Sequence, residues 1–290
     1  MIPIILGPTG VGKSDFAIKL AKKINGEIIS ADSCQVYKYF DIGSAKVSKQ
    51  QQKEIPHHLI DILNPDQTFN ACLFQSYAKN CIDDIKSRGK VPIICGGTGL
   101  YIAGLVYNYD FNNAQRDENF RKECENIISE HGISVLYQRL VDCNPELARQ
   151  INANDKTRII RALETNSFPS KKNTNLNEYI IFAIDCDRAE LYDNINKRVD
   201  IMVQNGLFEE VETILNKFGT SPQALKSIGY KEVVSYYKRE LTKQKSIELI
   251  KQHSRNYAKR QLTFIRGLKN VIWIQKNKTD EVIENYEKYL

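Results

Sequence analysis

The feature that most constrains this chain is a glycine-rich loop between a predicted buried strand and a predicted helix. Residues 2–6 form an uninterrupted apolar run, which is typical of a strand covered on both faces of a parallel sheet. Residues 13–24 carry apolar side chains at helical spacing, and Asn25 and Gly26 end that helix. The residues between satisfy G-x-x-x-x-G-K-[ST], and they are Gly7, Pro8, Thr9, Gly10, Val11, Gly12, Lys13 and Ser14. A strand, this loop and a helix in that order predict a phosphate-binding loop (P-loop) on an α/β sheet.

The chemistry of this loop predicts its ligand but not its reaction. Successive backbone N–H groups form a concave anion site, and the N-terminus of the helix adds positive potential. Lys13 supplies a mobile charge, and the hydroxyl of Ser14 can ligate a magnesium ion. A di- or triphosphate with Mg²⁺ as cofactor is therefore expected. NTPases, small-molecule kinases and transferases with a diphosphate leaving group all fit.

Strands and helices alternate along most of the remaining chain. Strands are predicted at 27–31, 91–95, 179–184 and 271–274, and helices at 71–86, 100–106, 188–216, 224–239, 245–264 and 281–289. This alternation predicts an α/β fold, with a parallel sheet and helices on both faces. Because residues 120–165 show helical periodicity only, we expect an all-helical domain at 111–178. It interrupts a P-loop α/β core that spans 1–110 and 179–290 and includes the C-terminal helices.

Composition excludes several classes of protein. Hydrophobic residues make up 42% and charged residues 26%, which is ordinary for a globular protein, and a net charge of +6 is compatible with an acidic partner without requiring one. The 7 cysteines are scattered without a C-x-x-C pair, and no Cys/His cluster has zinc-ligand spacing. The N-terminus lacks the basic flank of a signal peptide, and no apolar stretch approaches ~20 residues. We therefore expect a cytoplasmic monomer with no membrane partner.

One further match to a nucleotide-binding motif is interpreted as coincidental. The sequence NKTD at residues 277–280 matches the N-K-x-D with which G proteins hold guanine, and it follows a predicted strand. However, no D-x-x-G occurs in the chain, and the motif lies after the C-terminal helices. A polar turn that caps the last helix through Thr279 or Asp280 is the better interpretation.

Two other loops are expected to meet the P-loop. The stretch SADSCQVY (residues 30–37) follows the second predicted strand, and GGTGLY (residues 96–101) follows another. In an open parallel sheet, the loops at the carboxyl ends of the strands form the ligand crevice. Asp32 and Thr98 are therefore predicted to lie near the bound phosphates.

Together these stretches resemble the tRNA dimethylallyltransferase family, also called tRNA isopentenyltransferases. The matching stretches, in one order over nearly the whole chain, are GPTGVGKS at 7, ISADSCQVY at 29, DIGSAK at 41, PHHLID at 56, GGTGLYI at 96, TRIIRALE at 157, RVDIMVQNGLFEE at 198 and NYAKRQLTFIRG at 256. The sequence departs from the family pattern at Cys34, where Met is frequent, and at residues 38–40, where Arg-Gly-Met is common. No zinc-finger segment follows these stretches, so a bacterial-type member is expected.

The resemblance implies transfer of a dimethylallyl group from dimethylallyl diphosphate to N6 of adenosine 37 in tRNA, with the base flipped into a channel. Asp32 matches the residue that accepts the N6 proton, and Thr98 and Arg198 match residues that bind the diphosphate. The glycine loop of the family is often described as an ATP site, although the donor is a prenyl diphosphate. Positions that match tRNA contacts are Asp32, Ser33, Cys34, Gln35, Thr98, Arg121, Thr157, Arg158, Ile159, Ile160 and Arg161.

Residue chemistry agrees with this interpretation. An adenine amine is a weak nucleophile that benefits from a carboxylate positioned to accept its proton. Loop amides, Lys13, Arg198 and Mg²⁺ would stabilise the leaving diphosphate, and a base in the anticodon stem-loop must be extruded before it can react. Residues 251–270 contain basic residues and no acid, so contacts with tRNA phosphates are predicted there. The predicted contacts are Arg255, Lys259 and Arg260.

Two alternative functions remain open at this point. A P-loop small-molecule kinase would use ATP, and its basic helix would be incidental. A non-catalytic RNA-binding module would not need the loops of Asp32 and Thr98 at the crevice.

Two groups of titratable residues are given structural interpretations. Asp200, Glu209, Glu210 and Glu212 are interpreted as solvated helix surface, and His57 and His58 as packing or hydrogen-bonding residues rather than metal ligands.

Overall fold

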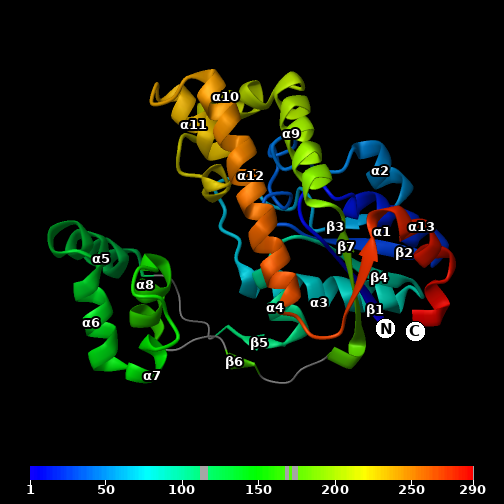
Figure 1. Cartoon of the computed structure of the whole chain (residues 1–290), viewed down its shortest axis with the longest axis horizontal. Helices are drawn as coiled ribbons and strands as arrows, with labels where there is room; N and C mark the ends of the chain where they lie inside the picture. The colour runs from blue at the N-terminus through cyan, green and yellow to red at the C-terminus, as the bar shows by residue number, and fades with distance from the viewer. Residues whose placement is uncertain (112–116, 167–169, 172–175, 290) are drawn as a thin grey trace. The chain divides into compact units, whose positions relative to one another are not determined.

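A computed structural model of the chain describes residues 1–111, 117–166, 170–171 and 176–289. In chain order the elements are β1 (Ile2–Leu6), α1 (Lys13–Lys23), β2 (Gly26–Ala31), α2 (Lys49–Glu54), β3 (His57–His58), α3 (Ala71–Ser87), β4 (Val91–Gly96), α4 (Gly99–Val106), β5 (Tyr109–Asp110), α5 (Glu118–His131), α6 (Ile133–Cys143), α7 (Pro145–Ala148), α8 (Lys156–Thr165), β6 (Ser170–Lys171), η1 (Leu176–Glu178), β7 (Tyr179–Asp185), α9 (Arg188–Gln204), α10 (Leu207–Phe218), η2 (Gln223–Lys226), α11 (Tyr230–Tyr237), α12 (Lys243–Arg266), β8 (Val271–Gln275), η3 (Lys276–Lys278), α13 (Thr279–Glu284) and η4 (Tyr286–Tyr289) (Figure 1). The chain forms two compact units, one of Met1–Val106 with Thr174–Leu290 and one of Tyr107–Asn173.

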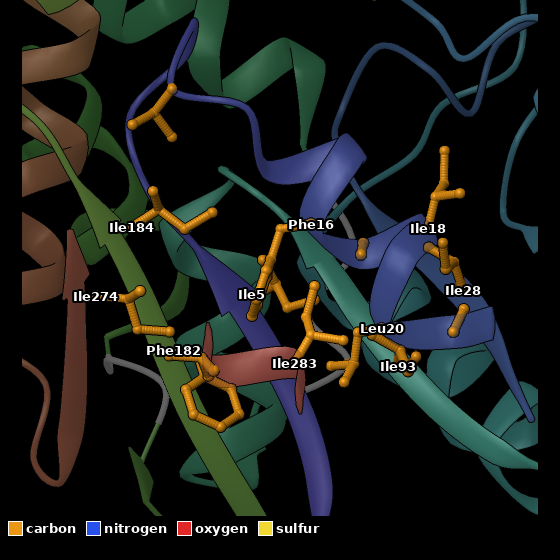
Figure 2. Packing of buried hydrophobic residues seen from close by; sticks show 14 of the residues in the cluster. Ile5, Phe16, Ile18, Leu20, Ile28, Ile93, Phe182, Ile184, Ile274 and Ile283 are labelled. Carbon is orange, nitrogen blue, oxygen red and sulfur yellow. The ribbon is translucent and has the colours of Figure 1, made fainter. Parts of the chain in front are cut away.

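A six-stranded parallel sheet forms the centre of the larger unit, in the order β3-β2-β4-β1-β7-β8. Ile5 and Ile93 join Phe16 of α1 in one buried cluster, which also includes side chains of α13 (Figure 2). Neighbouring side chains of a strand point to opposite faces, so the fully buried Ile4 and Ile94 face the other side of the sheet. Helix α3 contacts β2, β4 and α4 there. The predicted parallel sheet with helices on both faces is confirmed.

The strand order decides which loops meet. β4 lies between β1 and β2, with Ile5 paired to Cys95 and Ala31 paired to Gly96. All three strands run in the same direction, so the loops that follow them leave one edge of the sheet side by side. This edge is where a ligand crevice forms in open parallel sheets.

The C-terminal helices are more divided than their periodicity predicted. The helix expected at 188–216 breaks into α9 and α10 at Gly206, whose φ of 96° lies in the left-handed region that favours glycine. The helix expected at 224–239 consists of η2 and α11, which are separated at Gly229. Backbone conformation at single glycines therefore interrupts an apolar pattern that continues through them.

The expected capping of the last helix is wrong. Lys278 occupies the N-cap position of α13, so Thr279 and Asp280 lie in its first helical turn. The carboxylate of Asp280 instead accepts a hydrogen bond from Lys19 of α1 at 2.7 Å. An acidic side chain in a first turn is also favourable for the helix dipole.

Short elements at the edges were not predicted. Helix α2 and the two-residue strand β3 follow β2 in the chain, and the two-residue strand β6 pairs antiparallel with β5. In β3, His58 Nε2 lies 2.7 Å from Glu27 Oε2, and His57 Nδ1 lies 2.7 Å from the carbonyl oxygen of Ile55. The interpretation of both histidines as hydrogen-bonding residues is confirmed.

The smaller unit contains the helices α5–α8, with a core of its own that includes Leu136, Leu140 and Ile159. The carboxylate of Glu164 on α8 accepts hydrogen bonds from Arg121 at 2.9 and 3.0 Å and from Arg161 at 2.6 Å. These bonds lower the pKa of Glu164 to about 2 despite its burial. Among the described residues, no helix of either unit is long and apolar enough to cross a membrane.

Candidate active site

The P-loop connects β1 to α1, as the motif predicts. Gly12, at the N-cap of α1, has a φ of 98°, so backbone conformation rather than crowding requires glycine there. Lys13 begins the helix, and its Nζ donates a hydrogen bond to the carbonyl oxygen of Pro8 at 2.8 Å. The pKa of Lys13 is lowered to about 8, mainly by burial. The nearby charge of Arg198 contributes to this lowering, whereas Cys95 and Asp32 oppose it.

The first cleft opens beside this loop and has a volume of about 670 Å³, including space open to solvent. Its polar lining comes from the loops after β1, β2 and β4 and from helices α9 and α12. Those residues include Thr9, Lys13, Ser14, Asp32, Gln35, Gly97, Arg198, Tyr257 and Gln261. Four residues predicted from three separate stretches thus lie in one cleft, namely Lys13, Ser14, Asp32 and Arg198.

Asp32 directly follows β2 and lines this cleft. Its Oδ1 accepts hydrogen bonds from the backbone N–H groups of Cys34 at 2.8 Å and Gln35 at 3.2 Å. This local turn orients the carboxylate through the backbone of the two residues that follow Ser33. Burial lowers the pKa of Arg198, and the charge of Asp32 opposes that lowering.

A second cleft adjoins the first, and both are lined by Thr9, Asp32, Ser44, Arg198 and Tyr257. Its apolar lining comes mainly from α9 and α12, and includes Ile195, Val199, Met202, Ile228 and Ile250. Its basic lining residues are Arg198, Lys226, Lys231 and Arg260, and Asp32 is the acidic residue among them. The cleft beside the P-loop and a cleft with apolar walls and basic residues therefore meet at one carboxylate.

The GGTG loop approaches the site through Gly97, which lines the first cleft. A Cβ atom on Gly97 would lie 2.1 Å from Nε2 of Gln261, so a larger residue here would displace the end of that side chain. Thr98 is not among the residues that line the first cleft, although it follows Gly97 directly. Its backbone N–H donates to the carbonyl oxygen of Ala31 at 3.2 Å, and its side chain hydrogen-bonds Tyr257.

Two side chains of α12 that were not predicted to be site residues also line the first cleft. Gln261 accepts a hydrogen bond from the N–H of Thr9 at 2.8 Å and donates one to the carbonyl oxygen of Gly97 at 3.1 Å. The hydroxyl of Tyr257 donates to the same oxygen at 3.3 Å, and burial raises its pKa to about 12. Their spacing in the sequence could have indicated that both face the protein interior, because Tyr257 and Gln261 are four residues apart and share a helix face with the buried Ile265.

The basic residues of α12 have two different environments. Lys251 pairs with Asp200 at 2.6 Å, and Arg255 donates to Oδ1 of Asn196 at 2.6 Å. These contacts join α12 to α9, so Asp200 is more than solvated surface. Lys259 and Arg260 are exposed, and Arg260 lines the second cleft.

The interpretation of Glu210 as solvated surface is wrong. Its carboxylate accepts hydrogen bonds from the consecutive backbone N–H groups of Asp41, Ile42 and Gly43 at 3.0, 2.7 and 3.1 Å. The hydroxyl of Tyr230 donates a fourth bond at 2.8 Å. Glu210 therefore holds the segment that brings Gly43 and its neighbour to the second cleft.

The other residues expected at the base site lie close together. Ser33 and Cys34 line the second cleft, where the thiol of Cys34 lies 3.0 Å from Oγ of Ser227. Burial raises the pKa of this thiol to about 12. The side chain of Gln35 makes local hydrogen bonds. Its amide oxygen accepts from Ser30 at 3.0 Å, and its amide nitrogen donates to the Ser44 carbonyl oxygen at 3.4 Å.

In the helical unit, the predicted tRNA-contact stretch has buried and exposed members. The side chains of Ile159 and Ile160, 0% and 4% exposed, belong to the core of this unit and are not surface contacts, which corrects the expectation. Thr157 and Arg158 are exposed on the same helix. Helical periodicity is the physical reason, because a continuous stretch of α8 presents both its buried and its exposed faces.

The sequence and the fold both have close counterparts. Residues 35–268 match a family model described as IPP transferase, and residues 1–61 match one described as isopentenyl transferase. A tRNA dimethylallyltransferase of Oceanobacillus iheyensis is 45% identical over 291 residues, covering 97% of this chain and 93% of the relative. One from an Exiguobacterium species is 46% identical over 282 residues, covering 94% and 89%.

Solved structures agree over the same length. A tRNA isopentenylpyrophosphate transferase from Bacillus halodurans has a TM-score of 0.76 at 36% identity, covering 99% of this chain and 96% of its own. The enzyme from Staphylococcus epidermidis has a TM-score of 0.73 at 40% identity, with coverage of 99% and 98%. A eukaryotic dimethylallyltransferase, solved acting on tRNA, has a TM-score of 0.75 at 29% identity, covering 99% of this chain and 76% of its own.

These relatives decide between the functions that the P-loop alone left open. They are transferases of one kind, matched over nearly the whole of this chain, and this favours a transferase over a P-loop kinase. The resemblance drawn from the eight sequence stretches is confirmed, and this chain is an enzyme that belongs to the tRNA dimethylallyltransferase family.

Proposed function

We propose that this enzyme transfers the dimethylallyl group of dimethylallyl diphosphate to N6 of adenosine 37 in the anticodon stem-loop of tRNA, forming N6-isopentenyladenosine in the cytoplasm and acting as a monomer. The observation that carries the proposal is that Asp32 lines both clefts at their junction. A donor in one cleft and an acceptor base in the other would meet at this carboxylate.

The donor diphosphate is assigned to the first cleft. Loop amides, Lys13 and Arg198 would bind its charge, with Thr98 contributing from the edge. Among the described residues, no group of three or more His, Cys, Asp or Glu side chains could hold a metal by itself. The site still fits Mg²⁺, because Ser14 supplies an oxygen and magnesium usually shares its coordination with substrate phosphates. The ion would neutralise charge on the leaving diphosphate.

The adenine is assigned to the second cleft, whose apolar walls suit a flipped base. The N6 lone pair attacks C1 of the prenyl group while the bond from C1 to the diphosphate oxygen breaks, and the diphosphate leaves with that electron pair. Asp32 accepts the N6 proton. Enclosing the amine and the carboxylate together supplies the proximity on which such a transfer depends.

The tRNA backbone is assigned to the exposed basic residues around the second cleft, chiefly Lys259 and Arg260. Arg255 would contribute only if its bond to Asn196 opened. In the inserted helical domain, Thr157 and Arg158 are the proposed contacts. Arg121 and Arg161 would support that domain by holding Glu164 rather than by binding RNA directly.

The deciding experiment offers the protein an unmodified anticodon stem-loop with radiolabelled dimethylallyl diphosphate or with ATP. Label from the prenyl donor should appear on one adenine, and inorganic pyrophosphate should compete with the donor. A stem-loop with guanine in place of that adenine should accept no label, because guanine carries an oxygen where adenine carries the amine. Consumption of ATP with no prenyl transfer would favour the kinase and withdraw the roles of Asp32 and Thr98.

A further inference from the structure

We infer that Gln261 is a positioning residue of the donor site, which holds the P-loop and the GGTG loop at a fixed separation across the first cleft. The inference deepens the proposed function, because it assumes that a diphosphate occupies this cleft. It assigns a role in donor binding to a residue of the helix that carries the proposed tRNA contacts Lys259 and Arg260.

Both the oxygen and the nitrogen of the Gln261 side-chain amide form hydrogen bonds. Its Oε1 accepts the N–H of Thr9 in one loop at 2.8 Å, and its Nε2 donates to the carbonyl oxygen of Gly97 in the other at 3.1 Å. The residue is buried, with 6% of its surface exposed. A buried amide with satisfied groups at both ends defines one side-chain geometry, and removing it leaves an N–H and a carbonyl unpaired. Glutamate could accept from Thr9 but could not donate to Gly97.

The glycine at position 97 points to the same contact. Among the described residues, and apart from the chain neighbours of Gly97, the atoms within 4 Å of an added Cβ belong only to Gln261, the nearer of them at 2.1 Å. Its φ is not in the left-handed region, so nothing in the backbone demands glycine. An alanine there would displace the end of the Gln261 side chain. It would thereby break the hydrogen bonds of Gln261 to Thr9 and Gly97, here called the Gln261 bridge, without removing Gln261.

The Gln261 bridge lies where it can affect binding of the donor diphosphate as well as folding. Thr9, Gly97 and Gln261 all line the first cleft together with Lys13. Tyr257, one turn earlier on α12, donates to the same Gly97 oxygen at 3.3 Å and also lines the cleft. A shift of α12 would therefore move both loops relative to the phosphates.

The test measures binding of inorganic pyrophosphate with Mg²⁺ by isothermal titration calorimetry, with no tRNA present. The variants are Gln261→Met, which keeps the side-chain length without hydrogen bonds, and Gly97→Ala. Gln252→Met, at an exposed position of the same helix, is the matched control. Gln261→Met should weaken binding about tenfold, the effect of one or two lost hydrogen bonds, and the control should not. Gly97→Ala should weaken it similarly, and the double variant should be no worse than either single one.

Turnover kinetics supply a second readout. The variants should raise KM for the prenyl donor more than KM for tRNA. Control-like pyrophosphate binding by Gln261→Met would overturn the inference, and so would losses that add in the double variant. A purely structural role would lower the melting temperature without changing pyrophosphate affinity. If Gln261→Met does not fold, Gly97→Ala alone decides. Wild-type protein that binds pyrophosphate but transfers no prenyl group would refute the proposed function and leave this inference standing.

Discussion

The carboxylate of Glu210 should control both stability and tRNA use, because it holds residues 41–43 beside the second cleft. Glu210→Ala removes the acceptor of three consecutive backbone N–H groups and of the hydroxyl of Tyr230. Hydrogen bonds to a charged group each contribute about 1.5–3 kcal/mol, but water can replace the carboxylate at the exposed Asp41 N–H. We therefore expect a loss of about 2–4 kcal/mol in the free energy of unfolding.

Partial removal of the contacts should give a graded series. Tyr230→Phe deletes one donor and should cost about 1 kcal/mol. Glu210→Gln should fall between it and Glu210→Ala, because the amide keeps one acceptor oxygen and turns an NH₂ group toward N–H donors. The ring of Phe40 packs on Tyr230 with centroids 4.7 Å apart, and Tyr230→Phe preserves that packing.

Urea unfolding followed by circular dichroism would measure these losses, and steady-state kinetics would measure KM for tRNA. Glu209→Gln, at the neighbouring exposed position of α10, is the matched control. Loosening the segment should raise KM for tRNA more than KM for the donor, since Gly43 lines the second cleft and not the first. Unfolding of Glu210→Gln that is indistinguishable from Glu209→Gln would refute the reasoning.

Three further results are expected. Asp32→Asn should retain pyrophosphate and tRNA binding but lower the single-turnover rate by ~10²–10⁴-fold, the usual effect of losing a general base, and a near-wild-type rate would contradict the role. Lys13→Ala should weaken pyrophosphate binding. The calorimetric difference from wild type should narrow as pH rises through 8, because the ammonium, with a pKa of about 8, is charged below that value and neutral above it; a difference independent of pH would count against this. Glu164→Gln should destabilise the protein near neutral pH. The pKa of Glu164 is about 2 in the folded protein against an ordinary 4.5, so its contribution to stability is present above pH 4.5 and lost toward pH 2. A difference in urea midpoint between Glu164→Gln and wild type that persists at pH 2 would contradict this role of the carboxylate.

The sequence by itself determined the parts of this protein that depend on neighbours in the chain. The P-loop is eight consecutive residues between a strand and a helix, so its composition alone specifies an anion site. Periodicity likewise predicted β7 and the helical content of residues 120–165. The Asx turn that orients Asp32 is local as well, since both its donors lie within three residues.

Contacts between distant segments were decided only by the tertiary structure. Strand order sets β4 between β1 and β2, and this order places Asp32 beside Lys13. Gln261 reaches Thr9 across 252 residues of sequence, and Glu210 reaches Ile42 across 168. In the chain both read as ordinary polar residues of a helix, because the groups that need them are backbone N–H and C=O groups. Every residue carries such groups, so a sequence pattern does not reveal which ones a distant side chain will satisfy.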